Sequence, residues 1–330
     1  MIRLRTRNIV LGALLAIVCA TACFALSRFS AFLVYTVVIA TIGALALNLL
    51  IGYCGQISFA QGALLGVGAY TGGNLGNAGY DILSLLGAGV AGAVVSAICG
   101  LPAMRLRGLY FAIATLAAQA ILEYLFKTLE PITKGVSGLT ILPLKVFGYA
   151  VASDQGYAAL SIIVLLLAWL FLSWLMRTNM GRAFLIVRES ELVARGMGIN
   201  VGRTKMFAFV ISGFIVGIAG ALLGFTSRLA NPEAFGLHLS IDYIAMIIVG
   251  GLGSWGGSLI GAAFVTLLPE AIQRLGESLH VADLLFALRE MTFGLLIIIF
   301  LIFEPRGLAA IGRRLQVMFL RATTKRKIAV

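Results

Sequence analysis

The sequence predicts an all-α, polytopic helical membrane protein with about 8–10 transmembrane spans, some of them broken or re-entrant at Gly-rich segments. Of its 330 residues, 61% are hydrophobic and 12% are charged, whereas a soluble domain carries about 25% charged residues. Several apolar runs reach ~18 residues or more, the length that crosses ~30 Å of hydrocarbon. These runs do not alternate apolar and polar residues as the strands of a membrane β-barrel do. Residues 1–330 are therefore expected to form a single transmembrane domain.

Nine apolar stretches are expected to lie in the membrane. They are Asn8–Leu26, Ala31–Ile51, Ile57–Gly73, Ile82–Leu101, Gly108–Lys127, Tyr157–Met176, Met206–Ser227, Ser240–Gln273 and Leu284–Phe303. Eight of them have 17 to 22 residues, enough for one helix across the bilayer. Ser240–Gln273 has 34 residues and contains the run Gly250–Gly257, so we expect two crossings or two half-helices joined at that break.

The first stretch shares features with a secretory signal peptide. It follows Arg3, Arg5 and Arg7, and Ala20-Thr-Ala-Cys23 resembles a processing site. Because many further spans follow, we interpret it as an uncleaved first span, with a signal peptide as the alternative.

Basic residues gather in four segments. These are the N-terminus, the turn with Arg105 and Arg107, the island Met176–Lys205 and the basic tail 304–330, which together hold 18 of the 25 Lys and Arg residues. The positive-inside rule places such segments, and both termini, in the cytoplasm. The polar segment Thr128–Gly156 is then external, and the number of crossings is even. Orientation and lipid-headgroup contact account for the net charge of +12, which argues against nucleic acid as a partner.

The segment Asn48–Gly73 combines glycines and polar side chains within an apolar region. Its seven glycines would each weaken an ordinary helix by about 1 kcal/mol, so close packing or a broken, cavity-lining backbone must compensate. Two interpretations stay open: tight packing with interhelical hydrogen bonds, or a translocation path lined by this segment. The candidate path residues here are Gly55, Gln56, Ser58, Gln61, Gly62 and Tyr70.

A second Gly-rich interruption lies in the other half of the chain, at Gly250–Gly257. No phosphate-loop Gly-Lys-Ser/Thr follows it, so we interpret it as a helix break rather than a nucleotide site. Gly-interrupted segments in both halves suggest an internal duplication around a path at the midplane of the membrane. The candidate path residues in this break are Gly250, Gly251, Gly253 and Ser254.

The polar island, residues 177–205, is expected to be a cytoplasmic loop with a short amphipathic helix. Ser190 can cap that helix, with Glu189 and Glu191 near its positive end, and Gly196 and Gly198 can end it. Such a helix suits docking into a groove of a soluble partner; the alternative is a solvated connector on the membrane surface. The candidate docking residues are Arg188, Glu189, Ser190, Glu191, Leu192, Ala194, Gly196, Met197 and Gly198.

Other classes of function lack their usual residues. The four cysteines form no CxxC pair and only two His occur, which argues against a metal site, and no motif suggests a cofactor. No acid, base and nucleophile set indicates a membrane enzyme such as a lipid-modifying transferase. The ionisable residues near the membrane are Glu123, Asp242, Glu270, Arg289 and Glu290. They show no series that would couple ions in a secondary transporter or channel.

A set of motifs, in order along nearly the whole chain, resembles the branched-chain amino-acid ABC transporter permease family, of the LivM type. The motifs are Asn48–Ala63, Gly66–Thr71, Arg105–Leu116, Gly135–Thr140, Gly181–Asn200, Lys205–Ser212, Val249–Gly257 and Glu304–Leu308. Each is weak alone, and together they are specific.

The resemblance implies a permease subunit, not an enzyme, in a bacterial inner membrane. It implies a second permease subunit, two cytoplasmic ATPase subunits, and a periplasmic solute-binding protein that delivers leucine, isoleucine or valine. Arg188–Asn200 would be the coupling helix that sits in a groove of the ATPase. The chain departs from the usual pattern at Cys54, Phe59–Gln61 and Ser190. These departures leave urea, short amides and aromatic acids open as substrates.

Overall fold

The structure is a computed structural model that describes residues 27–106, 108–146, 149–151, 153–278 and 294. Two predicted spans, Asn8–Leu26 and Leu284–Phe303, and the basic tail 304–330 lie outside the described residues. The expected cytoplasmic location of the two termini falls outside them as well.

The described elements are mostly helical. The long helices are α2 (Arg28–Asn48), α3 (Gln61–Asn77), α4 (Leu83–Gly100), α5 (Leu109–Thr128), α7 (Asp154–Leu175), α10 (Val201–Ser227), α11 (Leu237–Gly250) and α12 (Trp255–Ser278). The shorter helices and turns are η2 (Leu49–Tyr53), η3 (Leu101–Met104), α6 (Glu130–Thr133), η4 (Gly135–Ser137), α8 (Asn179–Glu189), α9 (Glu191–Gly196) and η5 (Pro232–Phe235). The strands form two antiparallel pairs, β1 (Leu139–Thr140) with β4 (Leu229–Ala230), and β2 (Lys145–Val146) with β3 (Tyr149–Ala150).

The predicted fold class, an all-α polytopic membrane protein, is confirmed. Within the described residues, seven helical stretches are long and apolar enough to cross a membrane. The predicted break in Ser240–Gln273 is also confirmed, since α11 ends at Gly250 and α12 begins at Trp255. Gly251 and Gly253 between them have φ values of 116° and 73°, which favour glycine.

Two predicted helix starts were wrong by several residues. Within the predicted span Ile57–Gly73, the helix begins only at Gln61, and residues 55–60 are not helical. The helix predicted from Met206 begins at Val201, because Asn200 Oδ1 accepts a hydrogen bond from Arg203 N at 3.0 Å and so caps it earlier.

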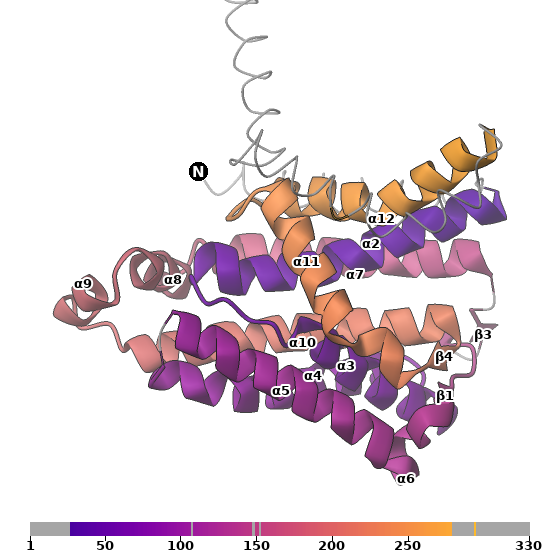
Figure 1. Cartoon of the computed structure of the whole chain (residues 1–330), viewed down its shortest axis with the longest axis horizontal. Coiled ribbons are helices and arrows are strands. Elements are labelled where there is room, and N and C mark those ends of the chain that lie inside the picture. Colours follow the sequence, from indigo (N-terminus) through magenta and orange to yellow (C-terminus); the bar gives the residue numbers. More distant parts are fainter. Residues whose placement is uncertain (1–26, 107, 147–148, 152, 279–293, 295–330) are drawn as a thin grey trace, which may run out of the picture.

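The helices form one bundle with two distinct ends (Figure 1). At one end, the β end, β1 pairs with β4, and Asn77 at the end of α3 donates to Thr140 O at 2.8 Å. At the other, the α9 end, α8 and α9 extend beyond the long helices (Figure 1). There Lys205 of α10 donates to Ala103 O of η3 at 3.1 Å.

Glycines bring α10 into backbone contact with its neighbours α3 and α4. A Cβ on Gly68 of α3 would lie 2.1 Å from Gly217 O of α10, and a Cβ on Gly220 would lie 2.0 Å from Leu65 O. Helices in membranes associate through such close contacts between small residues. For the later part of the Gly-rich segment, the structure therefore supports the packing interpretation.

Candidate functional site

The first turn of α3 lies inside the bundle, and other helices satisfy its backbone N–H groups. The first N–H groups of a helix lack intrahelical partners, and the N-cap residue Ala60 makes no side-chain capping bond. Gly62 N donates to Ser240 Oγ of α11 at 2.8 Å, and Ala63 N donates to Gln119 Oε1 of α5 at 2.8 Å. Two membrane helices thus cap a third.

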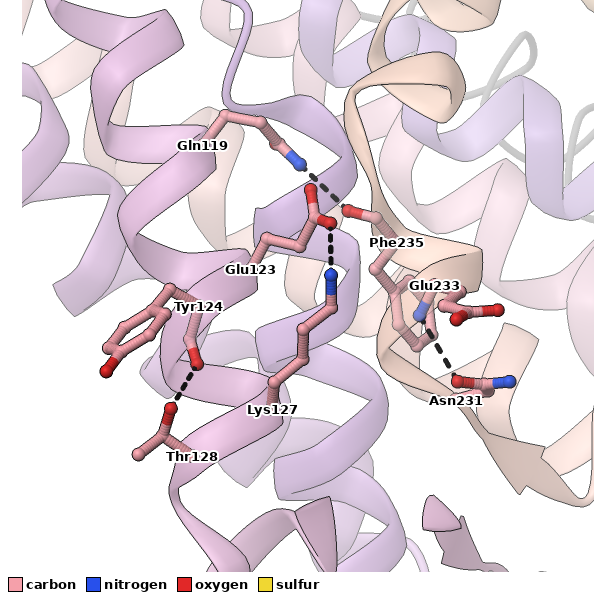
Figure 2. A network of polar contacts seen from close by, with 8 residues as sticks. All are labelled: Gln119, Glu123, Tyr124, Lys127, Thr128, Asn231, Glu233 and Phe235. Atoms are coloured by element: carbon pink, nitrogen blue, oxygen red, sulfur yellow. Dashed lines mark hydrogen bonds and ion pairs between the residues drawn. The ribbon is translucent and has the colours of Figure 1, made fainter. Parts of the chain in front are cut away.

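Gln119 connects three segments of the chain. Besides binding Ala63 N, its Oε1 accepts from Ser240 Oγ at 3.2 Å, and its Nε2 donates to Phe235 O at 2.8 Å. Figure 2 shows the side chain reaching from α5 to the Phe235 carbonyl. Gln119 is 1% exposed, so water does not reach its amide group. The three hydrogen bonds within the protein satisfy that group instead.

Helix α11 begins beside the start of α3. A Cβ on Gly62 would lie 2.7 Å from Gly236 O and 3.1 Å from Phe235 O. Two helix starts from distant parts of the chain therefore meet within the bundle with no spare room. We call Gln61–Ala63, Gln119, Phe235–Gly236 and Ser240 the interior junction.

The predicted path residues near the interior junction are mostly buried between helices. Gln61 Nε2 donates to Gly43 O of α2 at 2.9 Å, and Gln56 and Ser58 bond to backbone groups of their own segment. Of the six predicted path residues before and within α3, Gly55 alone is exposed. In this conformation these side chains fill the interior.

The predicted path residue Tyr70 lies in an aromatic cluster. Its ring centroid is 5.1 Å from that of Phe126 in α5 and 6.0 Å from that of Phe235 in η5. The buried Tyr70 hydroxyl has no hydrogen-bond partner within the described residues. Because Phe235 also binds Gln119, the cluster adjoins the interior junction.

A polar stripe on α5 extends from the β end to the interior junction. Thr115, Gln119, Glu123 and Lys127 follow at four-residue spacing, which places them on one face of the helix. Glu123 Oε1 and Lys127 Nζ form an ion pair at 2.9 Å (Figure 2). The sequence analysis missed this stripe, although the regular spacing within an apolar helix was a usable signal.

The second Gly-rich break, with Gly250, Gly251, Gly253 and Ser254, lies at the α9 end against the end of α2. The fully buried Asn48 binds it with three hydrogen bonds. Its Nδ2 donates to Ser254 O at 3.0 Å and to Ser258 Oγ at 2.7 Å, and its Oδ1 accepts from Gly253 N at 2.9 Å. The two Gly-rich segments thus touch through the end of α2, while the start of α3 meets the start of α11.

Asn48→Leu is expected to loosen this contact strongly, because leucine has a similar size but no hydrogen-bonding atoms. Unsatisfied buried polar groups cost about 1–3 kcal/mol each, so we expect the protein to lose about 2–5 kcal/mol of stability. The check is the thermal unfolding midpoint of the purified protein in detergent. Asn77→Leu, an exposed position that also makes hydrogen bonds, is the control and should change the midpoint little. An equal midpoint for both variants would contradict the role of Asn48.

The predicted helix in the polar island is present as α9, and Ser190 caps it. Ser190 Oγ accepts from Val193 N at 3.4 Å, and the same residue ends α8. Leu192, Val193 and Met197 are 81%, 49% and 65% exposed, so the apolar side of α9 faces away from the bundle. Ala194 is buried in a small cluster with Val187 and Val201.

The remaining docking candidates are placed on either side of this apolar surface. Glu189, at the end of α8, and Gly196 and Gly198, at the end of α9, are exposed. Glu191 instead lies against the bundle, where its Oε1 is 2.6 Å from Lys205 Nζ. Lys205 is 1% exposed.

Sequence reasoning missed several residues that connect the helices. Asn48, Gln119 and Ser240 are polar groups in apolar spans, which is a signal for partners within the bundle. Lys205 was counted as an orientation charge, and its burial could not be read from the sequence. Among the described residues, no group of three or more His, Cys, Asp or Glu could hold a metal ion.

Comparison with known proteins links this arrangement to transport. The model of a family described as branched-chain amino acid transport system / permease component matches residues 28–302. The high-affinity branched-chain amino acid transport system permease protein LivM of Salmonella typhimurium is 28% identical over 88% of this chain and 72% of its own length. LivM of Escherichia coli is 27% identical with the same coverage.

Relatives named for other substrates match a smaller part. The ribose import permease protein RbsC of Haemophilus influenzae is 33% identical over 50% of this chain and 53% of its own length. The autoinducer 2 import system permease protein LsrC of an Enterobacter species is 31% identical over 63% of this chain and 60% of its own length. No solved structure matches the chain at a significant level.

Proposed function

The chain belongs to the family of branched-chain amino acid transport permease components, and from this premise we propose that it is the membrane subunit of an ATP-driven importer of branched-chain amino acids. As a permease it is a transport component and not an enzyme. In this proposal, residues 1–330 form one permease domain of a bacterial inner membrane. Separate subunits hydrolyse the ATP.

The observation that carries the proposal is the position of α9. This short helix lies at one end of the bundle, and its exposed Leu192 and Met197 give it an apolar surface. Such a surface fits a groove on another protein. We assign that protein as an ATPase, with residues 177–205 as the coupling loop.

Charge supports an orientation with the α9 end in the cytoplasm. The island Met176–Lys205 has six Lys and Arg residues and contains α8 and α9, which lie at this end (Figure 1), and segments rich in Lys and Arg stay in the cytoplasm. The external β end would then receive solute from a periplasmic solute-binding protein. The termini and the tail 304–330 would be cytoplasmic.

We place the translocation path at the interior junction and along the polar stripe of α5. Interrupted helices inside a membrane are where transporters build substrate sites. The stripe with Gln119, Glu123 and Lys127 supplies polar groups from the β end inward. A second permease subunit, most simply a different chain, would complete the path, and two ATPase subunits would drive it.

Leucine, isoleucine and valine are the proposed substrates, because the relatives that match most of the chain are named for branched-chain amino acids. Urea, short amides and aromatic acids are the alternatives. A secondary transporter is a separate alternative, and it would need neither ATP nor partner ATPases.

The test begins with purification of the chain from its native membrane in a mild detergent and mass spectrometry of the proteins that accompany it. We expect ATPase subunits, a second permease and a solute-binding protein. The complex in liposomes should then take up labelled leucine only with ATP and binding protein, and competition with valine, urea and phenylalanine would identify the substrate class. A chain that purifies alone and moves solute without ATP would refute the importer.

A further inference from the structure

The end of α8 is fixed to the end of α2 through Arg188. Its Nη1 donates a hydrogen bond to Gly52 O in the turn η2. The same nitrogen would lie 3.1 Å from a Cβ on Gly253, in the break between α11 and α12. One side chain thus connects the proposed coupling loop with two parts of the bundle.

The backbone of α8 also lies directly on the start of a non-helical segment. A Cβ on Gly55 would be 3.3 Å from Arg188 Cα and 3.2 Å from its Cγ. Gly55 has φ of 70°, a conformation that glycine adopts at little cost. We call residues Gly55–Ala60 the unwound segment. It begins where α8 touches it.

The start of α9 is fixed to α10 by a buried ion pair, and the lysine of that pair also binds η3. Lys205 Nζ lies 2.6 Å from Glu191 Oε1 and donates to Ala103 O at 3.1 Å. Lys205 is 1% exposed and the Glu191 side chain 17% exposed. A buried charge without its partner is strongly unfavourable, so the pair holds α9 and α10 together when either moves.

The unwound segment leads straight into the interior junction. Gln56 N donates to Leu50 O of η2 at its first end, and Phe59 N donates to Thr115 Oγ1 of α5 at 3.1 Å near its second. The next residues, Gln61 and Gly62, form the first turn of α3. Contacts are therefore continuous from α9 to the interior junction.

We propose that Arg188 and the Lys205–Glu191 pair form a mechanical link, by which movement of α9 displaces the unwound segment and the first turn of α3. The link rests on the proposed function, since it acts when an ATPase moves α9. Arg188, Lys205 and Glu191 are positioning residues. They touch neither ATP nor solute, and they convert a motion at the α9 end into a rearrangement of the interior junction.

The experiment uses the whole complex in liposomes and measures leucine uptake and ATP hydrolysis in the same sample. The variants are Arg188→Gln, Lys205→Met, Glu191→Gln and the double variant Lys205→Met/Glu191→Gln. Arg105→Gln after η3 and Arg274→Gln on α12 are matched controls, because both are exposed cations outside residues 177–205. The readout is uptake per ATP hydrolysed.

We expect uptake per ATP to fall about tenfold in each link variant, the size of a typical coupling between sites, and to stay normal in the controls. The double variant separates a link from a structural pair. It leaves no buried unpaired charge, so a merely structural pair would recover normal uptake per ATP, while a broken link stays uncoupled.

The results distinguish the two proposals. Wild-type complex without ATP-dependent uptake would refute the proposed function. Active wild type together with normal uptake per ATP in Arg188→Gln and the double variant would overturn the link alone. If the single variant Lys205→Met or Glu191→Gln fails to assemble, Arg188→Gln and the double variant decide between a link and no link.

Discussion

Gly62→Val is expected to abolish ATP-dependent uptake. The Cβ of any larger residue would lie 2.7 Å from Gly236 O and 3.0 Å from Ser240 Oγ, and the first of these is a backbone atom that cannot rotate away. Relief requires the starts of α3 and α11 to separate, which breaks the Gly62 N to Ser240 Oγ hydrogen bond. Overpacking of this kind costs about 1–3 kcal/mol or more of stability. Here the overpacked residues lie at the interior junction, where we place the translocation path.

The measurement for Gly62→Val is uptake in liposomes together with the yield of assembled complex. Gly62→Ala should give a smaller loss in the same direction, because only one methyl group is added. Gly256→Val is the matched control, since a Cβ there meets nothing within 4 Å. Wild-type uptake and yield in Gly62→Val would mean that α3 and α11 need not approach closely.

Gln119→Leu is expected to have the second largest effect. Leucine fills a similar volume but leaves Ala63 N and Phe235 O without their partners. At about 1–3 kcal/mol for each unsatisfied buried group, the variant loses about 2–5 kcal/mol of stability. The first turn of α3 is then held mainly by the bond from Gly62 N to Ser240 Oγ.

The check for Gln119→Leu is the thermal midpoint in detergent and the uptake rate. Thr128→Val on the same helix is the control: within the described residues its hydroxyl bonds to Tyr124 O of its own helix, at the exposed end of α5 (Figure 2), so both quantities should stay near wild type. An unchanged midpoint in Gln119→Leu would show that the capping of α3 does not depend on this side chain.

Local features of the fold could be predicted from the sequence. The break between α11 and α12 follows from glycines that favour positive φ. The cap at Ser190 follows from a hydroxyl side chain before Glu191 at the start of a short helix. In both cases the cause lies within a few residues of the effect.

Features that depend on distant residues could not be predicted in this way. Helix α3 begins at Gln61 and not at the predicted Ile57, because Gln119 and Ser240 cap its first turn from other helices. Lys205 is adjacent to a basic loop in the sequence, and its burial depends on the packing of η3, α9 and α10. The roles of the candidate path and docking residues stay predictions.

The capping of α3 by later helices also sets an order for folding during synthesis of the protein. Gly62 precedes its partner Ser240 by 178 residues, and Ala63 precedes Gln119 by 56. At about 5–20 residues per second, Gly62 is added to the chain roughly 10–35 s before Ser240. During that interval its first turn must find temporary partners in water, lipid or the insertion machinery. Helix α11 therefore completes a helix that was made much earlier, and a nascent chain that stops before α11 cannot close the interior junction.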